Sequence, residues 1–380
     1  MAYRVLHISD VHLERSFASM GCQGELARRR RDGLRQALRR AGEAAAETGC
    51  DAITIGGDLY ELDRATADTG VFLAKLFASW ARPVLIAPGN HDPAMRGSLY
   101  GTVDWPANVH IFTAPTFAPF ELADGLTLWG LGHDEPTWQG DPLDIDPIRS
   151  AGVHVALFHG SDLGHVPDGK APHAPFHSYQ LRDRGFSAAL CGHYHAQRCD
   201  TKTGLLYPGT PEPLAFDETG ARGPVVVDID HGGEVIFTPL ALNLWNVATI
   251  DCNIADADSS SDIAEMAIDV AKSCATDLET SNCMLQLRLI GSPESSVSID
   301  TRSVEHQVRD SGNFASVQVK DCSSIALDAQ SLAEEPSVRG EFARSMLERV
   351  ESGDEDQREL LEEALRYGLE ALSGLEVGLR

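Results

Sequence analysis

The chain has 380 residues, of which 43% are hydrophobic and 23% charged, and its formal net charge is −26. This composition is ordinary for a soluble globular protein, and the length is enough for one large domain and a smaller one. The longest apolar stretches are too short to cross a membrane, and the strong acidity argues against indiscriminate binding to nucleic acid.

The first apolar run covers residues 3–8 and leads directly into the polar residues Ser9 and Asp10. We therefore predict that the chain starts with a core strand and not with a signal peptide, and we expect a cytoplasmic protein with no membrane partner. The eight cysteines are scattered without CxxC pairs. We expect reduced and mostly buried thiols, because neither a disulfide framework nor a zinc–thiolate site is indicated.

The first 240 residues alternate apolar strands with amphipathic helices. The predicted strands cover residues 4–9, 51–55, 83–87, 109–112, 127–130, 153–158 and 188–190. Helices are predicted over 25–48 and 69–80, and the first is followed by Gly49, a favourable residue at the end of a helix. This alternation predicts a layered α/β core with largely parallel strand pairing.

The pattern changes near residue 245. Strands are predicted over residues 247–252, 284–289 and 314–320, with a helix over 262–275, and two further helices over 338–350 and 357–372. Residues 241–380 carry 27 acidic and 11 basic residues, so this part is also acidic. We expect three parts: a large α/β domain over 1–244, a small α+β capping domain over 245–330 and a C-terminal helical segment over 331–380.

Five short polar motifs lie at or near the ends of predicted strands. In chain order they are Asp10-Val-His12, Gly57-Asp58, Gly89-Asn90-His91-Asp92, His159-Gly160 and Gly192-His193-Tyr194-His195. Carboxylates, an amide and imidazoles are suitable ligands for divalent manganese, iron or zinc. Ligand-binding residues of α/β sheets lie in the loops at the carboxyl ends of the strands, where these motifs are placed.

The number of candidate ligands fits a pair of ions. Two ions roughly 3.5–4 Å apart need a shared carboxylate and separate terminal ligands, and Asp58 is the natural bridge. One ion could then take Asp10, His12 and one of the two late histidines. The other could take Asn90, His159 and the remaining late histidine.

In this order and spacing, the five motifs resemble those of the calcineurin-like metallophosphoesterase superfamily. Within it the chain resembles the DNA-repair exonuclease branch, which includes SbcD-like nuclease subunits and YhaO-like exonucleases. The supporting segments are HISDVH at 7–12, GGDLY at 56–60, PGNHD at 88–92 and YPGT at 207–210. The strong match covers residues 1–240, and RGEF at 339–342 and ALRYGL at 364–369 resemble the C-terminal part of the YhaO-like group more weakly.

The resemblance implies a four-layer αββα sandwich in the first domain, followed by the small α+β cap and the terminal helices. It implies two divalent metal ions, with manganese expected and iron, zinc or magnesium as alternatives. The implied ligands of the first ion are Asp10, His12, Asp58 and His195, and those of the second are Asp58, Asn90, His159 and His193. His91 matches the histidine that assists at the scissile phosphate, and Asp92 is expected to accept a hydrogen bond from it and fix its orientation.

The implied function is a metal-dependent phosphodiesterase, specifically a DNA exonuclease or endonuclease of DNA repair. A hydroxide bridging both ions would attack phosphorus in line. DNA is the expected substrate, an SbcC-like or YhaN-like coiled-coil ATPase is an expected partner, and a homodimer is possible. Two alternatives remain: a phosphoesterase for small molecules such as cyclic nucleotides or phosphomonoesters, and a non-catalytic scaffold for an ATPase.

Several side chains admit two interpretations. The basic face of the first helix, from Arg28 to Arg31 with Arg35, Arg39 and Arg40, is either a solvated surface or a track for a phosphate backbone. The apolar stripes of the terminal helices either pack on the protein itself or dock a partner. His133, and likewise His165, His173 and His177, either contacts substrate or is a loop residue without a role.

Overall fold

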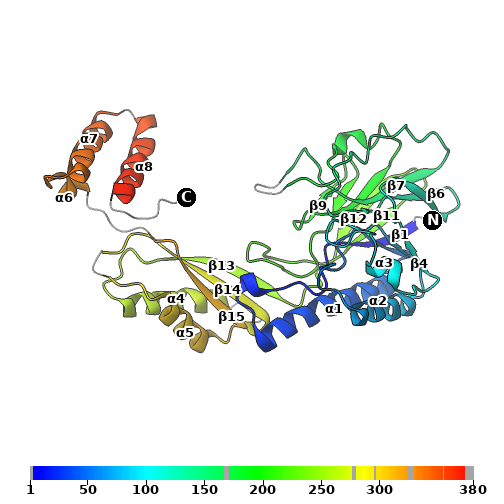
Figure 1. Ribbon diagram of the computed structural model, residues 1–380, viewed down its shortest axis with the longest axis horizontal. Helices are drawn as coiled ribbons and strands as arrows, with labels where there is room; N and C mark the ends of the chain where they lie inside the picture. The colour runs from blue at the N-terminus through cyan, green and yellow to red at the C-terminus, as the bar shows by residue number, and fades with distance from the viewer. Residues whose placement is uncertain are drawn as a thin grey trace. The chain divides into compact units, whose positions relative to one another are not determined.

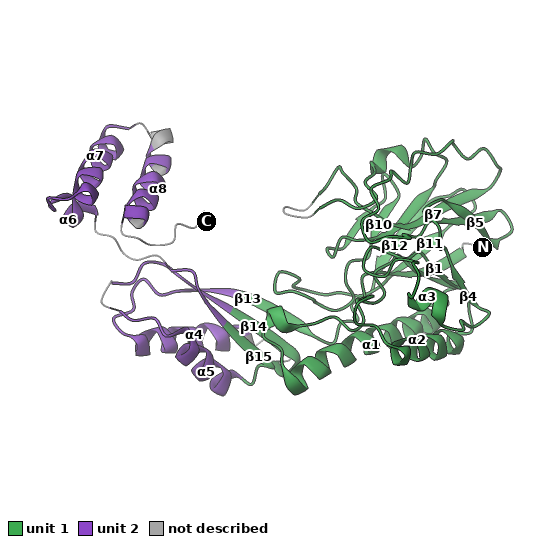
Figure 2. Cartoon of the chain, in the orientation of Figure 1, with its two compact units in different colours: residues 1–249, 277–286, 313–318 green, residues 250–276, 287–312, 319–380 purple. Residues whose placement is uncertain are grey.

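The computed structural model describes residues 3–166, 171–275, 280–294, 297–323, 329–353 and 355–372. The chain forms two compact units, which Figure 2 shows in different colours. The first unit comprises residues 1–249, 277–286 and 313–318, and the second comprises residues 250–276, 287–312 and 319–380. No described helix combines the length and the apolar character needed to cross a membrane.

The first unit contains two six-stranded sheets. One has the order β12-β11-β1-β2-β3-β4, with β1 (Tyr3–Ile8), β2 (Ala52–Ile55), β3 (Val84–Ile86), β4 (Val109–Ile111), β11 (Val225–Ile229) and β12 (Val235–Pro239). Strands β1 to β4 are mutually parallel, whereas β11 and β12 extend the sheet as an antiparallel pair.

The other sheet has the order β5-β6-β7-β8-β10-β9. Its strands are β5 (Ala118–Ala123), β6 (Leu126–Gly130), β7 (Val153–His159), β8 (Ala188–Gly192), β9 (Arg198–Asp200) and β10 (Leu205–Tyr207). Strands β6, β7, β8 and β10 are parallel, and the two outer strands pair antiparallel with their neighbours. The sequence predicted most of the parallel strands and missed β10 and the antiparallel strands.

The central strands β2, β3, β7 and β8 are buried on both faces, which explains their continuous apolar sequences. In β1, Leu6 and Ile8 point to the core beneath the helices, whereas Val5 points to the core between the two sheets, as the two-residue period of a strand requires. In β7, Val155 packs between the sheets and Phe158 packs on the outer face of the second sheet. The layered α/β sandwich expected from the sequence is therefore confirmed.

Helices α1 (Gly24–Glu47), α2 (Ala67–Ser79) and α3 (Leu99–Thr102) cover the outer face of the first sheet, and α1 and α2 lie side by side (Figure 1). Helix α1 buries a stripe at spacings of three and four residues, which includes Leu34, Leu38 and Ala41. It ends before Gly49, whose φ of +67° is a left-handed conformation that suits glycine. A short 3-10 helix, η1 (Ala18–Met20), precedes it.

The outer face of the second sheet is covered differently. Residues 131–150, 160–166 and 171–187 cross it largely as loops, and the last of these ranges contains the 3-10 helix η2 (Ser178–Gln180). Leu143, Phe176 and Phe186 from these loops pack on Phe158 of the sheet. Loop cover leaves more room for surface pockets than a packed helix does.

The remaining strands form a three-stranded sheet with the order β13-β14-β15. These are β13 (Asn246–Asn253), β14 (Cys283–Ile290) and β15 (Ser316–Asp321), with η3 (Thr280–Asn282) before β14 and helices α4 (Ser260–Ala275) and α5 (Thr301–Gly312). The terminal helices are α6 (Ala329–Ala333), α7 (Val338–Ser352) and α8 (Glu355–Leu372). They pack around Ala343, Met346, Leu365 and Leu369, so their apolar stripes form a core of their own.

The eight cysteines are all free thiols, and most of them are buried.

Candidate metal centre

The seven predicted ligands lie at the carboxyl ends of five parallel strands, three from the first sheet and two from the second. They are Asp10 and His12 after β1, Asp58 after β2, Asn90 after β3, His159 as the last residue of β7, and His193 and His195 after β8. Because β1, β2 and β3 are adjacent and parallel, as are β7 and β8, their following loops meet at the same edge of the sandwich.

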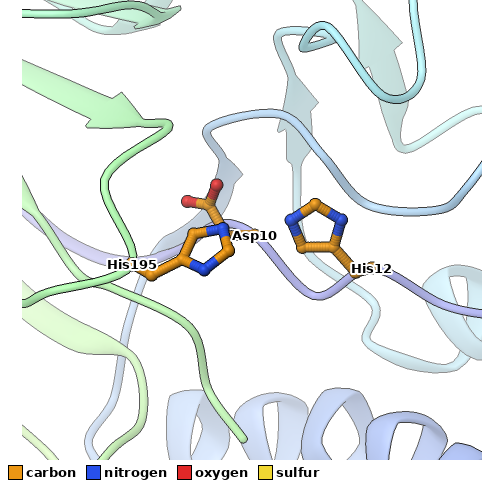
Figure 3. Close-up of side chains that lie close together, drawn as sticks. All are labelled: Asp10, His12 and His195. Carbon is orange, nitrogen blue, oxygen red and sulfur yellow. The ribbon is translucent and has the colours of Figure 1, made fainter. Parts of the chain in front are cut away.

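Two groups of ligand atoms gather around Asp10. Asp10, His12 and His195 offer atoms that all lie within 4.8 Å of one another, and so do Asp10, Asp58 and His159. Figure 3 shows the side chains of Asp10, His12 and His195 turned toward one another. The structure thus brings together the two carboxylates and three of the four predicted histidine ligands.

Asn90 and His193 lie beside the second group. The Nε2 atom of His159 is 3.0 Å from Asn90 Oδ1 and 3.4 Å from Asp58 Oδ2. The ring centroids of His159 and His193 are 5.1 Å apart. The backbone N–H of His193 donates to both carboxylate oxygens of Asp10 at 3.1 Å. All seven predicted ligands therefore occupy one contiguous site.

The backbone at the site is strained. Asp10, His12, Asp58 and His193 have φ values of 52°, 50°, 51° and 111°, a region that non-glycine residues rarely adopt. Such conformations cost on the order of 1–3 kcal/mol each and persist where the surroundings enforce them, often at functional sites. Four of the seven predicted ligands carry this strain, which supports a functional role for the site.

Glycines allow the ligand loops to approach one another closely. A Cβ atom on Gly57 would lie 2.7 Å from His159 Nδ1, and one on Gly89 would meet the Asp58 carboxylate. A Cβ on Gly192 would lie 2.8 Å from the Cβ of Ser9 and would also meet the carbonyl oxygen of Gly56. Glycine is required at these positions because any side chain would separate the ligands.

The residues present fit divalent cations. The Nε2 atom of His12 is buried without a hydrogen-bond partner in the described part of the chain, as expected of a nitrogen that faces a cation. Burial disfavours the charged form of Asp58, but His159 and His12 outweigh it and hold the pKa of this carboxyl well below its usual range. A charged, buried carboxylate beside imidazoles is a suitable ligand for such an ion.

Glu61 connects a predicted ligand to the predicted catalytic histidine. Its Oε1 accepts a hydrogen bond from His12 Nδ1 at 3.0 Å, and its Oε2 accepts one from His91 Nδ1 at 2.7 Å. The bond to Glu61 raises the pKa of His91 to about 9. Since both Nδ1 atoms are engaged, the Nε2 atoms are left to face a cation or a substrate.

The expected hydrogen bond from His91 to Asp92 is wrong. Asp92 is fully buried and turns away to accept from the backbone N–H groups of Asp58, Leu59 and Gly89 at 2.7–2.9 Å and from the Tyr100 hydroxyl at 2.6 Å. Four donors use up both of its oxygens, so it braces the loops that follow β2 and β3. Glu61, which holds His91 instead, was not among the predicted site residues.

Glu218 orients His195. Its Oε1 accepts from His195 Nδ1 at 2.6 Å, and its Oε2 accepts from the Thr210 hydroxyl and the Leu214 N–H, both at 2.8 Å. Arg222 donates to the carbonyl oxygens of His195 and Glu218 at 2.9 and 2.7 Å. Glu218 was not predicted as a site residue, because nothing in its local sequence distinguishes it from the many exposed acidic residues of the chain.

Two side chains near the site, His133 and Tyr194, have structural positions, and His173 borders a predicted ligand. His133 is fully buried and its Nε2 donates to the carbonyl oxygen of His159 at 2.8 Å, so it supports the end of β7 and does not face a substrate. Tyr194 is buried as well, with its ring tilted against that of Tyr207 at a centroid distance of 4.9 Å, and therefore lies behind the site wall. His173 is half-buried, and its ring lies 5.4 Å from that of His193.

The other two loop histidines lie elsewhere: His165 is exposed, and His177 packs 5.1 Å from the ring of Tyr179.

The basic face of α1 is only partly a solvated surface. Arg28 is exposed and pairs with Glu25 at 3.2 Å, as a solvated face predicts. Arg30 is 1% exposed, because it falls on the same stripe as Leu34. Its guanidinium lies 4.5 Å from the Phe17 ring and 4.7 Å from the Trp245 ring and donates to the carbonyl oxygen of Pro213. For Arg30, the interpretation as a solvated surface residue and the interpretation as part of a phosphate track are therefore both wrong.

Comparison with known proteins identifies the family. A family model described as calcineurin-like phosphoesterase matches residues 3–197, just over half of the chain. Among solved structures, a protein from Thermus thermophilus is 14% identical, with a TM-score of 0.39, over 63% of this chain and 99% of that one. A dimetal phosphatase from Danio rerio is 14% identical, with a TM-score of 0.34, over 60% of this chain and 92% of that one. No curated protein matches. The chain belongs to the calcineurin-like phosphoesterase family, which makes it a metal-dependent phosphoester hydrolase and implies two divalent ions at the site.

Proposed function

We propose that the protein is a two-metal phosphodiesterase that cleaves DNA, as a nuclease of DNA repair. The observation that carries the proposal is the convergence of the seven ligands on one site with His91 beside them. The choice of DNA rests on the motifs HISDVH, GGDLY, PGNHD and YPGT, which resemble those of the DNA-repair exonuclease branch. The acidity of the chain restricts such binding to the surroundings of the cations.

The protein's own residues prepare the site for in-line cleavage. When bound, divalent cations would neutralise charge on the phosphate oxygens and would lower the pKa of a water molecule that attacks phosphorus. Asp58 lies between His12 and His159, with its Oδ2 at 3.6 Å and 3.4 Å from their Nε2 atoms, which suits a carboxylate shared by two ions. Asp10 and Asp58 hold the negative charge that such a pair of ions requires.

His91 acts at the leaving group. Its side chain is 40% exposed, whereas the predicted ligands Asp10, His12, Asp58 and His159 are buried, so it is open to an incoming ester. With Nδ1 held by Glu61, Nε2 donates a hydrogen bond or a proton to the departing oxygen. Glu61 fixes the orientation of this ring together with that of His12.

Hydrolysis of end-labelled DNA tests the proposal. The full chain is incubated with single- and double-stranded DNA and with bis-p-nitrophenyl phosphate, each with manganese and with a chelator. We expect metal-dependent cleavage of all three substrates. Cleavage of the small ester without any action on DNA would instead favour a small-molecule phosphoesterase.

The variant His91→Ala distinguishes catalysis from metal binding. We expect it to retain both ions by elemental analysis while its turnover falls by roughly 10²–10⁴-fold, the usual contribution of a positioned proton donor. Full activity of this variant would remove His91 from the mechanism. A loss of metal together with activity would show that His91 is a ligand.

We further propose that the metal is manganese. We also propose that the chain has two kinds of partner, a coiled-coil ATPase and a second copy of itself in a homodimer. The resemblance of RGEF and ALRYGL to YhaO-like sequences supports the partner, and the exposed Val338 and Leu360 on α7 and α8 offer apolar contacts. Activity titrations with manganese, iron, zinc and magnesium test the metal. Light scattering of the chain, alone and with an SbcC-like ATPase of the same source, tests both assemblies.

A further inference from the structure

An apolar pocket lies on the outer face of the second sheet, away from the predicted metal ligands. Its volume is about 510 Å³, within the range of ligand pockets. Its walls are mainly aromatic and aliphatic: Phe117, Trp129, Leu131, Trp138, Ile145 and Ile148. None of the residues that line it belongs to the metal centre, so the mechanism proposed above does not explain it.

The sequence of the covering loop produces this pocket. Pro136, Pro142 and Pro147 prevent residues 131–150 from forming a packed helix, so the segment crosses the sheet as a loop. Leu143, which is 1% exposed, anchors the loop to the core below. Trp138 is only partly buried and lines the pocket.

The floor of the pocket is firmly packed. The ring of Phe117 lies 5.8 Å from that of Phe158 and 5.2 Å from that of Phe186. The indole nitrogen of Trp129 donates to His154 Nδ1 at 3.2 Å, which fixes the orientation of this ring. These two side chains are therefore held in place by the protein itself, and binding against them would not require their ordering.

The rim of the pocket is acidic. Asp141, Asp144 and Asp146 line it and are exposed, whereas Arg149 is the cation among the lining residues. None of these four forms an ion pair with any residue that the structure describes. An apolar floor with uncompensated carboxylates at its edge disfavours phosphate and favours a cationic partner.

We propose that this pocket is a docking site for a partner protein. A large aliphatic or aromatic side chain of the partner inserts between Trp129, Trp138 and Ile148, and lysine or arginine side chains on either side of it pair with Asp144 and Asp146. A peptide matches the combination of apolar walls and an exposed acidic rim, because it can carry an apolar side chain between cationic ones. The inference does not depend on the substrate of the metal centre.

Fluorescence anisotropy with labelled hexapeptides tests the proposal. The probes carry a central leucine–phenylalanine pair flanked on each side by two lysines, two serines or two glutamates. We expect the lysine-flanked peptide to bind at least tenfold more tightly than the glutamate-flanked one, and this difference to shrink at high salt. Equal binding of the three peptides, or no binding of any, would overturn the proposal.

Charge reversal at the rim locates the binding. In the double variant Asp144→Lys/Asp146→Lys the order of the peptides should invert, while hydrolysis of bis-p-nitrophenyl phosphate stays unchanged and shows that the fold is intact. The matched control, Asp32→Lys/Glu47→Lys, places the same charges on exposed positions of α1 and should leave the order as it was. An unchanged order in the rim variant contradicts the proposal, as does displacement of the peptide by an oligonucleotide, which would assign the pocket to nucleic acid.

Discussion

Two carboxylates that are not among the predicted ligands orient the histidines of the metal centre. Glu61 accepts hydrogen bonds from both His12 and His91, whereas Glu218 accepts one from His195. A carboxylate on one ring nitrogen fixes the tautomer and the direction of the other nitrogen. Because Glu61 serves a ligand and a catalytic group and Glu218 serves a ligand alone, their substitutions should have different consequences.

We expect Glu61→Gln to weaken metal binding by roughly 10–100-fold and also to lower kcat when the metal is saturating. Glu218→Gln should weaken binding to a similar extent, but its kcat at saturating metal should approach that of the parent. Competition with a metal-sensitive dye gives the affinities, and hydrolysis of bis-p-nitrophenyl phosphate across a metal titration gives kcat. Identical behaviour of the two variants would argue against the dual role of Glu61.

His7 should make the fold sensitive to acid. Its ring is fully buried between the sheets, donating from Nε2 to the carbonyl oxygen of Cys191 at 3.1 Å and accepting at Nδ1 from the Thr54 hydroxyl at 2.9 Å. Burial lowers its pKa to about 4, against 6.5 for the unperturbed group. The neutral form is therefore favoured in the folded state, and its contribution to stability is complete above pH 6.5 and is lost as the pH falls toward 4.

The expected loss is about 3 kcal/mol over this interval, because each unit of pKa corresponds to about 1.4 kcal/mol. Urea unfolding of the parent and of His7→Gln between pH 7.5 and 4 measures it. The free energy of unfolding of the variant should fall less steeply with decreasing pH, whatever its absolute stability. An imidazole that titrates near pH 6.5 in the folded protein by NMR would contradict this assignment.

Among the secondary-structure elements, the sequence predicted those that carry a clear local pattern of apolar and polar residues. The strands β1, β2, β3 and β7 are continuous apolar runs that end in polar motifs, so sequence reasoning found both the strands and the ligands after them. The antiparallel strands β5, β9, β11 and β12 were missed, because they are short or follow one another without an intervening helix. Their position is determined by pairing with distant strands, such as β11 with β1, which local sequence does not encode.

The predicted site residues likewise carry a local sequence pattern, whereas the residues that were missed depend on contacts with distant segments. Asp10, Asp58 and His159 are each recognisable from a local motif at a strand end. Glu218 becomes functional only through its contact with His195, 23 residues earlier in the chain. Arg30 was assigned to a basic face because the sequence does not show that Phe17 and Trp245 enclose it. Contacts between distant segments are what sequence reasoning could not supply.

The packing of helix α1 against Trp80, the residue that follows α2, depends on Gly42 inside α1. A Cβ atom on Gly42 would lie 2.6 Å from two carbons of the Trp80 indole, which is closer than real contacts. Replacement of a helical glycine by alanine normally stabilises a helix by about 1 kcal/mol. Here the clash should outweigh that gain, and we expect Gly42→Ala to lower the free energy of unfolding by about 1–3 kcal/mol.

A double-mutant cycle with Trp80→Leu tests this contact. Removal of the indole makes room for the new methyl group, so the penalty of Gly42→Ala should largely disappear in the Trp80→Leu background. Urea unfolding of the parent, both single variants and the double variant gives the coupling energy. Equal effects of Gly42→Ala in the two backgrounds would show that the indole does not restrict this position.

At the scale of the first unit, the metal centre joins two separate sheets. Asp10, His12, Asp58 and Asn90 follow strands of the first sheet, whereas His159, His193 and His195 belong to the second. Two hydrogen bonds connect the sheets here without cations. The backbone N–H of His193 donates to the Asp10 carboxylate, and His159 Nδ1 donates to the carbonyl oxygen of Gly56 at 2.8 Å. Bound cations would add ligand bonds across the same junction and neutralise its carboxylates.

Removal of the metal should therefore lower the stability of the whole first unit. A cation present at 100 times its Kd stabilises the state that binds it by about 2.7 kcal/mol, which corresponds to a change in Tm of roughly 5–10 °C for a unit of this size. Differential scanning calorimetry with manganese and with a chelator measures the shift. The variant Asp58→Ala lacks the shared carboxylate, so its Tm should be nearly the same with manganese and with the chelator. A full metal-dependent shift in that variant would show that the stabilising ions bind elsewhere.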